Sequence, residues 1–131
     1  TEIEKLYARG IRVFMSGMAE GVDTICAEAV LALKALYNDV SLVAVLPYNH
    51  KASGRSLTEK KRFFKILENA DSVVTLQEKY SPDCYYKRNE YMVDNSDMLL
   101  AVYSESGGTA YTINYAAKKN KPIKICPQKL L

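Results

Sequence analysis

The chain has 131 residues, of which 48% are hydrophobic and 25% are charged, values typical of a globular protein. This length predicts a single domain, residues 1–131, with a core of its own. A net charge of +3 is compatible with an anionic ligand but too small to indicate nucleic-acid binding. No apolar run approaches the roughly 18 residues of a membrane span, and residues 1–9 lack the apolar core of a signal peptide. We therefore expect a cytoplasmic protein that makes no membrane contact.

The three cysteines, Cys26, Cys84 and Cys126, are scattered along the chain and odd in number. This pattern argues against a disulfide framework and suits a reducing compartment. With His50 as the single histidine and no Cys-x-x-Cys pair, the usual spacings of zinc ligands are absent. We expect neither a metal nor another cofactor.

The apolar pattern predicts helices and strands that alternate along the chain. After a short helix that Gly10 ends, the expected strands lie near residues 11–15, 42–46, 72–76, 98–103 and 122–126. The expected helices between them span residues 22–37, 59–69 with Thr58 as N-cap, 81–95 and 109–120. Residues 42–46 are uninterrupted apolar sequence, as in a strand that is covered on both faces, and Pro47 stops it.

This alternation predicts βαβ crossovers and hence an α/β fold: one Rossmann-like, doubly wound, mainly parallel sheet with helices on both faces. Such domains normally begin with a strand, whereas this chain opens on a helix and on Thr1. We therefore expect the native first strand and its loop to be missing from this sequence.

Ligands of open parallel sheets bind beyond the carboxyl ends of the strands. The segments 16–23 and 104–109 are both glycine-containing loops that lead into a helix, where free N–H groups and the helix dipole favour an anion. Pro47 and Tyr48 follow the strand between them. Each glycine loop alone is also compatible with a tight turn that Ser16 or Thr109 merely caps, and Asp23 then does no more than complement the helix dipole.

The expected helix 81–95 carries Arg88, whose planar guanidinium could clamp a phosphate. The alternative is an exposed arginine that pairs with Glu90 or Asp94. In both cases we expect Arg88→Ala to leave stability nearly unchanged, and only a phosphate site predicts weaker nucleotide binding, by about 2 kcal/mol. Four tyrosines crowd the same stretch and could stack on a base or pack in the core: Tyr80, Tyr85, Tyr86 and Tyr91.

Four motifs occur in order: residues 16–23 (SGMAEGVD), 44–48 (AVLPY), 88–97 (RNEYMVDNSD) and 107–112 (GGTAYT). Together they resemble the YpsA-like branch of the SLOG superfamily of Rossmann-like nucleotide-binding proteins. Relatives in that superfamily include the Lonely Guy phosphoribohydrolases and the DNA-processing protein A recombination mediators. The resemblance covers nearly the whole chain, and it implies a strand before residue 1 with a further glycine motif.

The resemblance implies a pocket for a nucleotide or its derivative across the strand ends. Ser16, Gly17, Gly21 and Asp23 would belong to its first loop, and Pro47 and Tyr48 to the next strand end. Gly107, Gly108 and Thr109 would cradle a phosphate that Arg88 and Asn89 face. Lonely Guy enzymes carry a glutamate after the glycine–threonine turn, but here Tyr111 and Thr112 follow Ala110. Because an oxocarbenium-like transition state needs a nearby carboxylate, this substitution argues against the same hydrolysis.

The leading hypothesis is therefore a binding or sensor module for a nucleoside phosphate or an ADP-ribose-like ligand. The enzyme alternative is a nucleoside-monophosphate phosphoribohydrolase whose acid is displaced to Glu20, Asp97 or Glu105. A third alternative is single-stranded DNA binding. In this hypothesis the tyrosines stack on the bases, and Lys79, Lys87 and Arg88 contact the phosphates along the strand. The family resemblance also suggests a homodimer.

Overall fold

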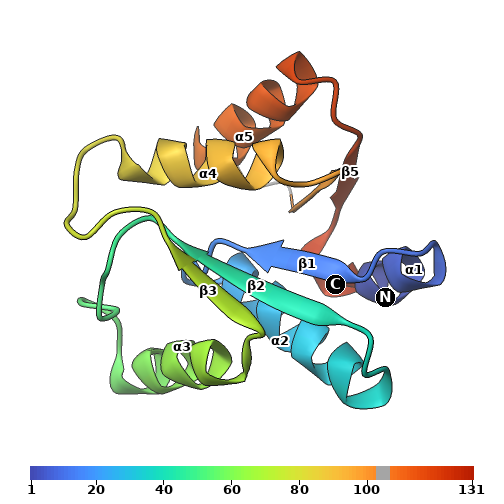
Figure 1. Cartoon of the computed structure of the whole chain (residues 1–131), viewed down its shortest axis with the longest axis horizontal. Helices are drawn as coiled ribbons and strands as arrows, with labels where there is room; N and C mark the ends of the chain where they lie inside the picture. Colours follow the sequence, from blue (N-terminus) through green and yellow to red (C-terminus); the bar gives the residue numbers. More distant parts are fainter. Residues whose placement is uncertain (103–106) are drawn as a thin grey trace.

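A computed structural model describes residues 1–102 and 107–131, and Figure 1 shows the arrangement of its helices and strands. The strands are β1 (Val13–Ser16), β2 (Ser41–Leu46), β3 (Ser72–Thr75), β4 (Leu99–Val102) and β5 (Ile123–Cys126). The helices are α1 (Glu2–Ala8), α2 (Val22–Leu36), α3 (Leu57–Asn69), α4 (Cys84–Asp94), α5 (Gly107–Lys118) and the short 3-10 helix η1 (Gln128–Leu130). The expected alternation of helices and parallel strands is confirmed.

Two helix starts differ from the expectation. Helix α3 begins at Leu57 instead of Glu59, and its N-cap is Ser56, because the Ser56 hydroxyl accepts a hydrogen bond from the N–H of Glu59 at 3.2 Å. A serine followed three residues later by a glutamate is the pattern of a capping box. Helix α5 begins at Gly107, so Gly107 and Gly108 lie in its first turn and not in the loop that the sequence suggested. Residues 104–106 of that loop lie outside the described residues.

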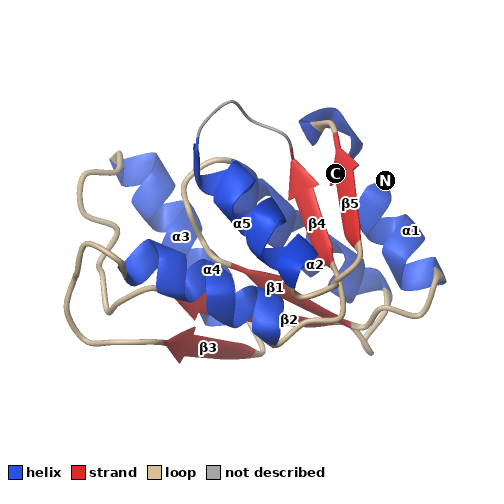
Figure 2. Cartoon of the chain, turned by 90° about the horizontal axis from the view of Figure 1, so that it is seen from above, coloured by secondary structure: helices blue, strands red, loops and turns tan. Residues whose placement is uncertain are grey.

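All the described strand pairings are parallel, but they form two sheets and not the single sheet that we expected. One sheet has the order β1-β2-β3 and the other pairs β4 with β5. In Figure 2, strands β4 and β5 cross the direction in which strands β1, β2 and β3 run. Strands crossed in this way cannot align their N–H and C=O groups in a common ladder.

Helices cover both faces of the three-stranded sheet. Figure 1 shows α2 and α3 on one face and α4 with α5 on the other, and α4 and α5 contact each other. This is the layer arrangement of a doubly wound, Rossmann-like domain. None of the described helices is both long and apolar enough to cross a membrane.

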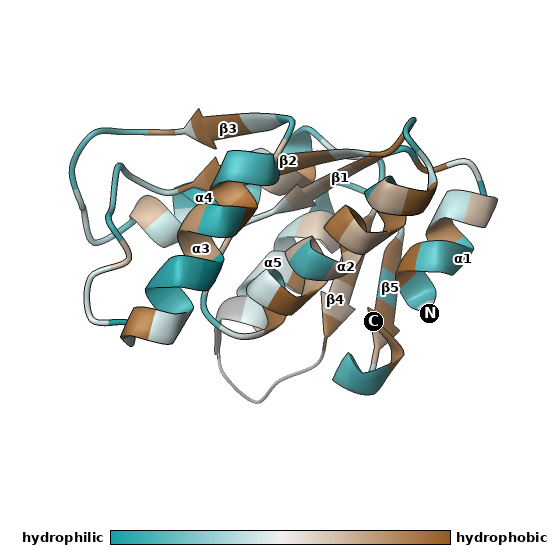
Figure 3. Cartoon of the chain, turned by 90° about the horizontal axis from the view of Figure 1, so that it is seen from below, coloured by the Kyte–Doolittle hydropathy of each residue, from teal (hydrophilic) through white to brown (hydrophobic). Residues whose placement is uncertain are grey.

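The core lies between the sheet and the helices α2 and α3. Strand β2 is its centre, with Leu42, Ala44 and Leu46 buried against the helices, and the apolar strands stand out in brown in Figure 3. From α3, Phe63 and Ile66 fill the space beneath the sheet. Because β1, β2 and β3 are parallel, their carboxyl ends share one edge, where the loops 17–21, 47–56 and 76–83 emerge.

Candidate functional site

The loop between β1 and α2 is held in shape by its own side chains. The Ser16 hydroxyl donates to the carbonyl oxygen of Asp23 at 3.0 Å and accepts from the N–H of Met18 at 3.2 Å. The Asp23 carboxylate accepts from the N–H of Ala19 at 3.1 Å. Met18 takes a left-handed backbone conformation, with φ of 61°, which is uncommon for a residue with a side chain. Ser16 and Asp23 therefore organise the loop at the end of β1.

Arg88 of α4 reaches into this loop and is only 6% exposed. Its Nη1 donates to the carbonyl oxygen of Gly17, and its Nε donates to Asn89 Oδ1 at 2.8 Å. A Cβ atom on Gly17 would lie 2.9 Å from Cζ, Nε and Nη1 of Arg88. Glycine at position 17 is therefore what allows the guanidinium to lie against the backbone, and Asn89 helps to orient it.

The ion-pair alternative for Arg88 is wrong in this structure. Glu90 accepts a hydrogen bond from the hydroxyl of Tyr111 at 3.0 Å, and Asp94 accepts one from the hydroxyl of Tyr115 at 3.0 Å. Because Arg88 is buried, we expect Arg88→Ala to lower the stability of the protein, contrary to the expectation from the sequence. Losing a buried, charged hydrogen-bond donor typically costs about 1.5–3 kcal/mol.

A second arginine, which the sequence analysis missed, joins the same loop. Arg55 lies in the segment after β2, and its Nη2 donates to the carbonyl oxygen of Met18 at 2.9 Å. Its guanidinium carbon is 4.9 Å from the centre of the Phe63 ring. Among the described residues, Nη1 of Arg55 is the buried side-chain polar atom that has no hydrogen-bond partner. The available signal was a basic residue in a loop at the carboxyl edge of the sheet.

The charges of this cluster act on one another. Burial raises the pKa of Asp23 above its ordinary value, and the positive charges of Arg88 and Arg55 offset part of that shift. Burial lowers the pKa of Arg88, which the charge of Asp23 opposes, and an arginine remains protonated in such a setting. Two cations and one carboxyl group give the site a positive balance, which favours an anion.

His50 lies beside the two arginines and supports the loop that carries Arg55. Its Nδ1 accepts a hydrogen bond from the N–H of Ala52 at 3.1 Å, and its ring lies 4.9 Å from that of Phe63. Burial lowers the pKa of His50, and the charges of Arg55 and Arg88 lower it further. His50 is therefore neutral at pH 7 and serves as part of the loop's internal packing.

Described contacts bring together Ser16, Gly17, Asp23, Arg88 and Asn89 from the sequence-predicted set. The other members are placed as follows: Gly21 has φ of 94° at the start of α2, Pro47 is buried, Tyr48 is half-buried, and Gly107, Gly108 and Thr109 form the first turn of α5. The described contacts do not join this α5 turn to the group around Arg88. Of the acids considered for catalysis, Glu20 and Asp97 are exposed, and Glu105 lies outside the described residues.

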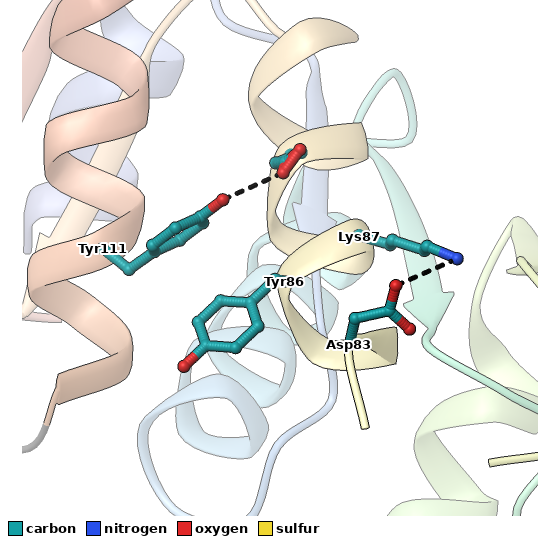
Figure 4. A pocket seen from close by; sticks show the side chains of 5 residues that line it. Asp83, Tyr86, Lys87 and Tyr111 are labelled. Atoms are coloured by element: carbon teal, nitrogen blue, oxygen red, sulfur yellow. Dashed lines mark hydrogen bonds and ion pairs between the residues drawn. The ribbon is translucent and has the colours of Figure 1, made fainter. Parts of the chain in front are cut away.

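A separate open pocket of about 450 Å³ lies between α4 and α5 (Figure 4). Its lining residues are Asp83, Tyr86, Lys87, Glu90 and Tyr111. The ring centres of Tyr86 and Tyr111 are 4.6 Å apart, and Lys87 forms an ion pair with Asp83 at 3.2 Å. None of the residues expected to line the nucleotide pocket borders this one, but Tyr86 and Lys87, which the single-stranded DNA alternative invoked, do. In residues 1–102 and 107–131, no cluster of His, Cys, Asp and Glu has the makings of a metal site.

Among solved structures, the chain resembles a protein from Syntrophus aciditrophicus SB that is named as a molybdenum carrier. The TM-score is 0.59 with 19% sequence identity, over 92% of this chain and 66% of the other. At that identity the likeness concerns the fold alone, and it supports the Rossmann-like assignment.

Curated relatives include YoqJ, a protein derived from the SPbeta prophage of Bacillus subtilis, which is 30% identical over 80% of this chain and 69% of its own length. UPF0398 proteins of Halalkalibacterium halodurans and Bacillus cereus strain Q1 are 30% and 31% identical, over 92% and 83% of this chain. The chain spans 66% and 61% of those two proteins. The model of the family described as the YspA SLOG family, YpsA, matches residues 1–127. Taken with the parallel strands and the loops at their carboxyl ends, this match shows that the chain belongs to the YpsA family of SLOG proteins.

Proposed function

We propose that this domain binds a nucleotide or a nucleotide-derived ligand, a nucleoside phosphate or an ADP-ribose-like molecule, and acts as a binding or sensor module. The observation that carries the proposal is the convergence of Arg88 and Arg55 on adjacent carbonyl groups, those of Gly17 and Met18. The two arginines come from α4 and from the loop after β2, and they meet at the carboxyl edge of the sheet. Ligands of doubly wound sheets bind at that edge.

Each guanidinium keeps donor capacity beyond its bonds to the protein. Nη1 of Arg55 is buried without a partner among the described residues, and Nη2 of Arg88 makes no described hydrogen bond. A buried donor without a partner is costly, and an anion that accepts from it removes that cost. Guanidinium groups match the geometry of phosphate oxygens, so a phosphate-bearing ligand fits this donor set.

Calorimetric titration with AMP, ADP and ADP-ribose tests the proposal. Arg55→Ala should weaken binding of the phosphate-bearing ligand at least about tenfold, since a charge-assisted hydrogen bond typically contributes roughly 1.5–3 kcal/mol. Arg88→Lys should also weaken binding, because an ammonium group cannot replace the planar guanidinium, which can bond two phosphate oxygens at once. Unlike Arg88→Ala, this variant keeps a cation at the site.

Arg12 provides a matched control. It is also partly buried, donates to a backbone carbonyl, that of Tyr7 at 2.8 Å, and lies over an aromatic ring. It precedes β1 and therefore lies at the opposite, amino end of the strands. Arg12→Ala should lower stability and leave affinity unchanged. Failure of all three ligands to bind, or equal affinity in the wild type and in the Arg55→Ala and Arg88→Lys variants, would contradict the proposal.

A further inference from the structure

Three tyrosines at the carboxyl edge of the sheet form a connected aromatic group, here called the tyrosine cluster: Tyr48, Tyr80 and Tyr85. The ring centre of Tyr48 is 5.8 Å from that of Tyr80 and 6.5 Å from that of Tyr85, both in edge-to-face geometry. Tyr80 and Tyr85 are 6.3 Å apart. Tyr48 follows β2, Tyr80 follows β3, and Tyr85 lies in the first turn of α4. Separate elements therefore bring these rings to one place.

The tyrosine cluster adjoins the two arginines. The guanidinium carbon of Arg88 lies 5.8 Å from the ring centre of Tyr85. On the other side of the cluster, the ring centres of Tyr48 and His50 are 5.1 Å apart. His50 packs on the ring of Phe63, and the guanidinium of Arg55 lies over that same ring. The aromatic rings thus form one continuous row that begins in the core at Phe63 and passes both guanidinium groups.

Two rings of the cluster are open to solvent. Tyr80 is 59% exposed and Tyr85 is 45% exposed, whereas Tyr48 is half-buried. Exposed aromatic rings that are held by neighbouring rings offer a firm surface on which a flat ligand can stack. Base–aromatic stacking is sequence-tolerant because every nucleobase has a π face.

We propose that Tyr80 and Tyr85 form the surface on which the base of the ligand stacks while its phosphate binds at Arg88 and Arg55. This inference rests on the proposed function and names the surface that recognises the base of its ligand. It therefore predicts that a sugar phosphate without a base binds more weakly than AMP. The pocket between α4 and α5 is the competing location for a base, since Tyr86 and Tyr111 line it.

The test exploits the absence of tryptophan from the chain. Tyr80→Trp introduces a single fluorescent indole at the most exposed ring of the cluster, and AMP should quench it as adenine stacks. Ribose 5-phosphate should bind without quenching. The matched control is Tyr86→Trp, which places the indole one residue after Tyr85, at a side chain that is 49% exposed and lines the other pocket. AMP should leave the fluorescence of that variant unchanged.

Calorimetry on Tyr80→Leu supplies a second measurement. Because stacking is lost but the arginines are untouched, the affinity for AMP should fall about tenfold, within the range known for base–aromatic stacking, and the affinity for ribose 5-phosphate should stay the same. Tyr80 makes no described side-chain hydrogen bond, so this variant should fold like the wild type.

Each outcome separates the two proposals. Quenching at position 80 that Arg55→Ala does not weaken supports the tyrosine surface and contradicts the arginine site. If AMP binding depends on Arg55 but quenching occurs only in Tyr86→Trp, or if AMP and ribose 5-phosphate bind equally, the phosphate site stands and the tyrosine surface is overturned. If neither compound binds but a single-stranded oligonucleotide quenches position 80, both proposals for a small nucleotide ligand fail. If nothing binds, both fail as well.

Discussion

Replacing Gly17 with alanine places a methyl group where the guanidinium of Arg88 now lies. The added Cβ would be 2.9 Å from three atoms of that group, well inside van der Waals contact. The clashing atoms belong to the far end of a side chain, so the arginine can move while the backbone stays in place. It then gives up its hydrogen bond to the Gly17 carbonyl, a bond from a buried charged donor. We expect Gly17→Ala to lower the free energy of unfolding by about 1–2 kcal/mol.

A double-mutant cycle tests this cause by urea denaturation. In an Arg88→Ala background the guanidinium is absent, so Gly17→Ala should cost less than about 0.5 kcal/mol, which makes the coupling energy about 0.5–2 kcal/mol. Gly21→Ala is the matched control. Gly21 has φ of 94° and no atom within 4 Å of an added Cβ, so its substitution costs about 1–2 kcal/mol through backbone strain alone.

The control cost should add to that of Arg88→Ala without coupling, because strain at Gly21 does not involve the arginine. The reasoning is refuted if Gly17→Ala is as costly without Arg88 as with it. It is also refuted if Gly17→Ala destabilises the protein by less than about 0.5 kcal/mol in the wild-type background, within the range of ordinary surface substitutions. Gly17→Ala should also weaken AMP binding, since the displaced guanidinium of Arg88 no longer contacts the phosphate of AMP.

Three further predictions concern stability. A hydrogen bond from Lys34 and one from the N–H of Leu42 lower the pKa of Asp71. As the pH falls, the Asp71 carboxylate is therefore protonated in the unfolded chain before it is protonated in the folded protein. The stability that Asp71 contributes is complete above about pH 4 and is lost as the pH falls through its folded pKa. Asp71→Asn should flatten this acid dependence of stability in urea titrations. Because the pKa of His50 is lowered, unfolding becomes easier as the pH falls below about 6.5, and His50→Asn, which keeps an acceptor for the N–H of Ala52, should remove that slope between pH 7.5 and 5. Asn120 has φ of 57° after α5, so Asn120→Gly should raise the unfolding free energy by about 0.5–1 kcal/mol; a decrease would contradict the strain argument.

The alternation of the elements was predictable because local signals in this sequence agree with one another. The apolar run of β2 ends where Pro47 begins, and the strands lie within two residues of their expected limits. The serine and glutamate at positions 56 and 59 also carried a capping signal, although the expectation chose Thr58 as the cap. Such features depend on residues that are close in sequence, and a single chain contains them.

The buried side of a helix and the contacts of the site depend on residues that are far apart in sequence. In α2 the apolar Leu36 is 77% exposed, whereas the polar Thr24 is buried because it faces the loop after β1 and donates to the carbonyl of Ala19. Arg88 and Gly17 are 71 positions apart, and Arg55 and Met18 are 37 apart. The spacing of residues within α4 suggested a surface ion pair for Arg88. Spacing within one helix contains no information about what packs against that helix. Only the tertiary fold, which stacks α4 over the carboxyl ends of β1 and β2, decides that this cation is buried and that a second one lies beside it.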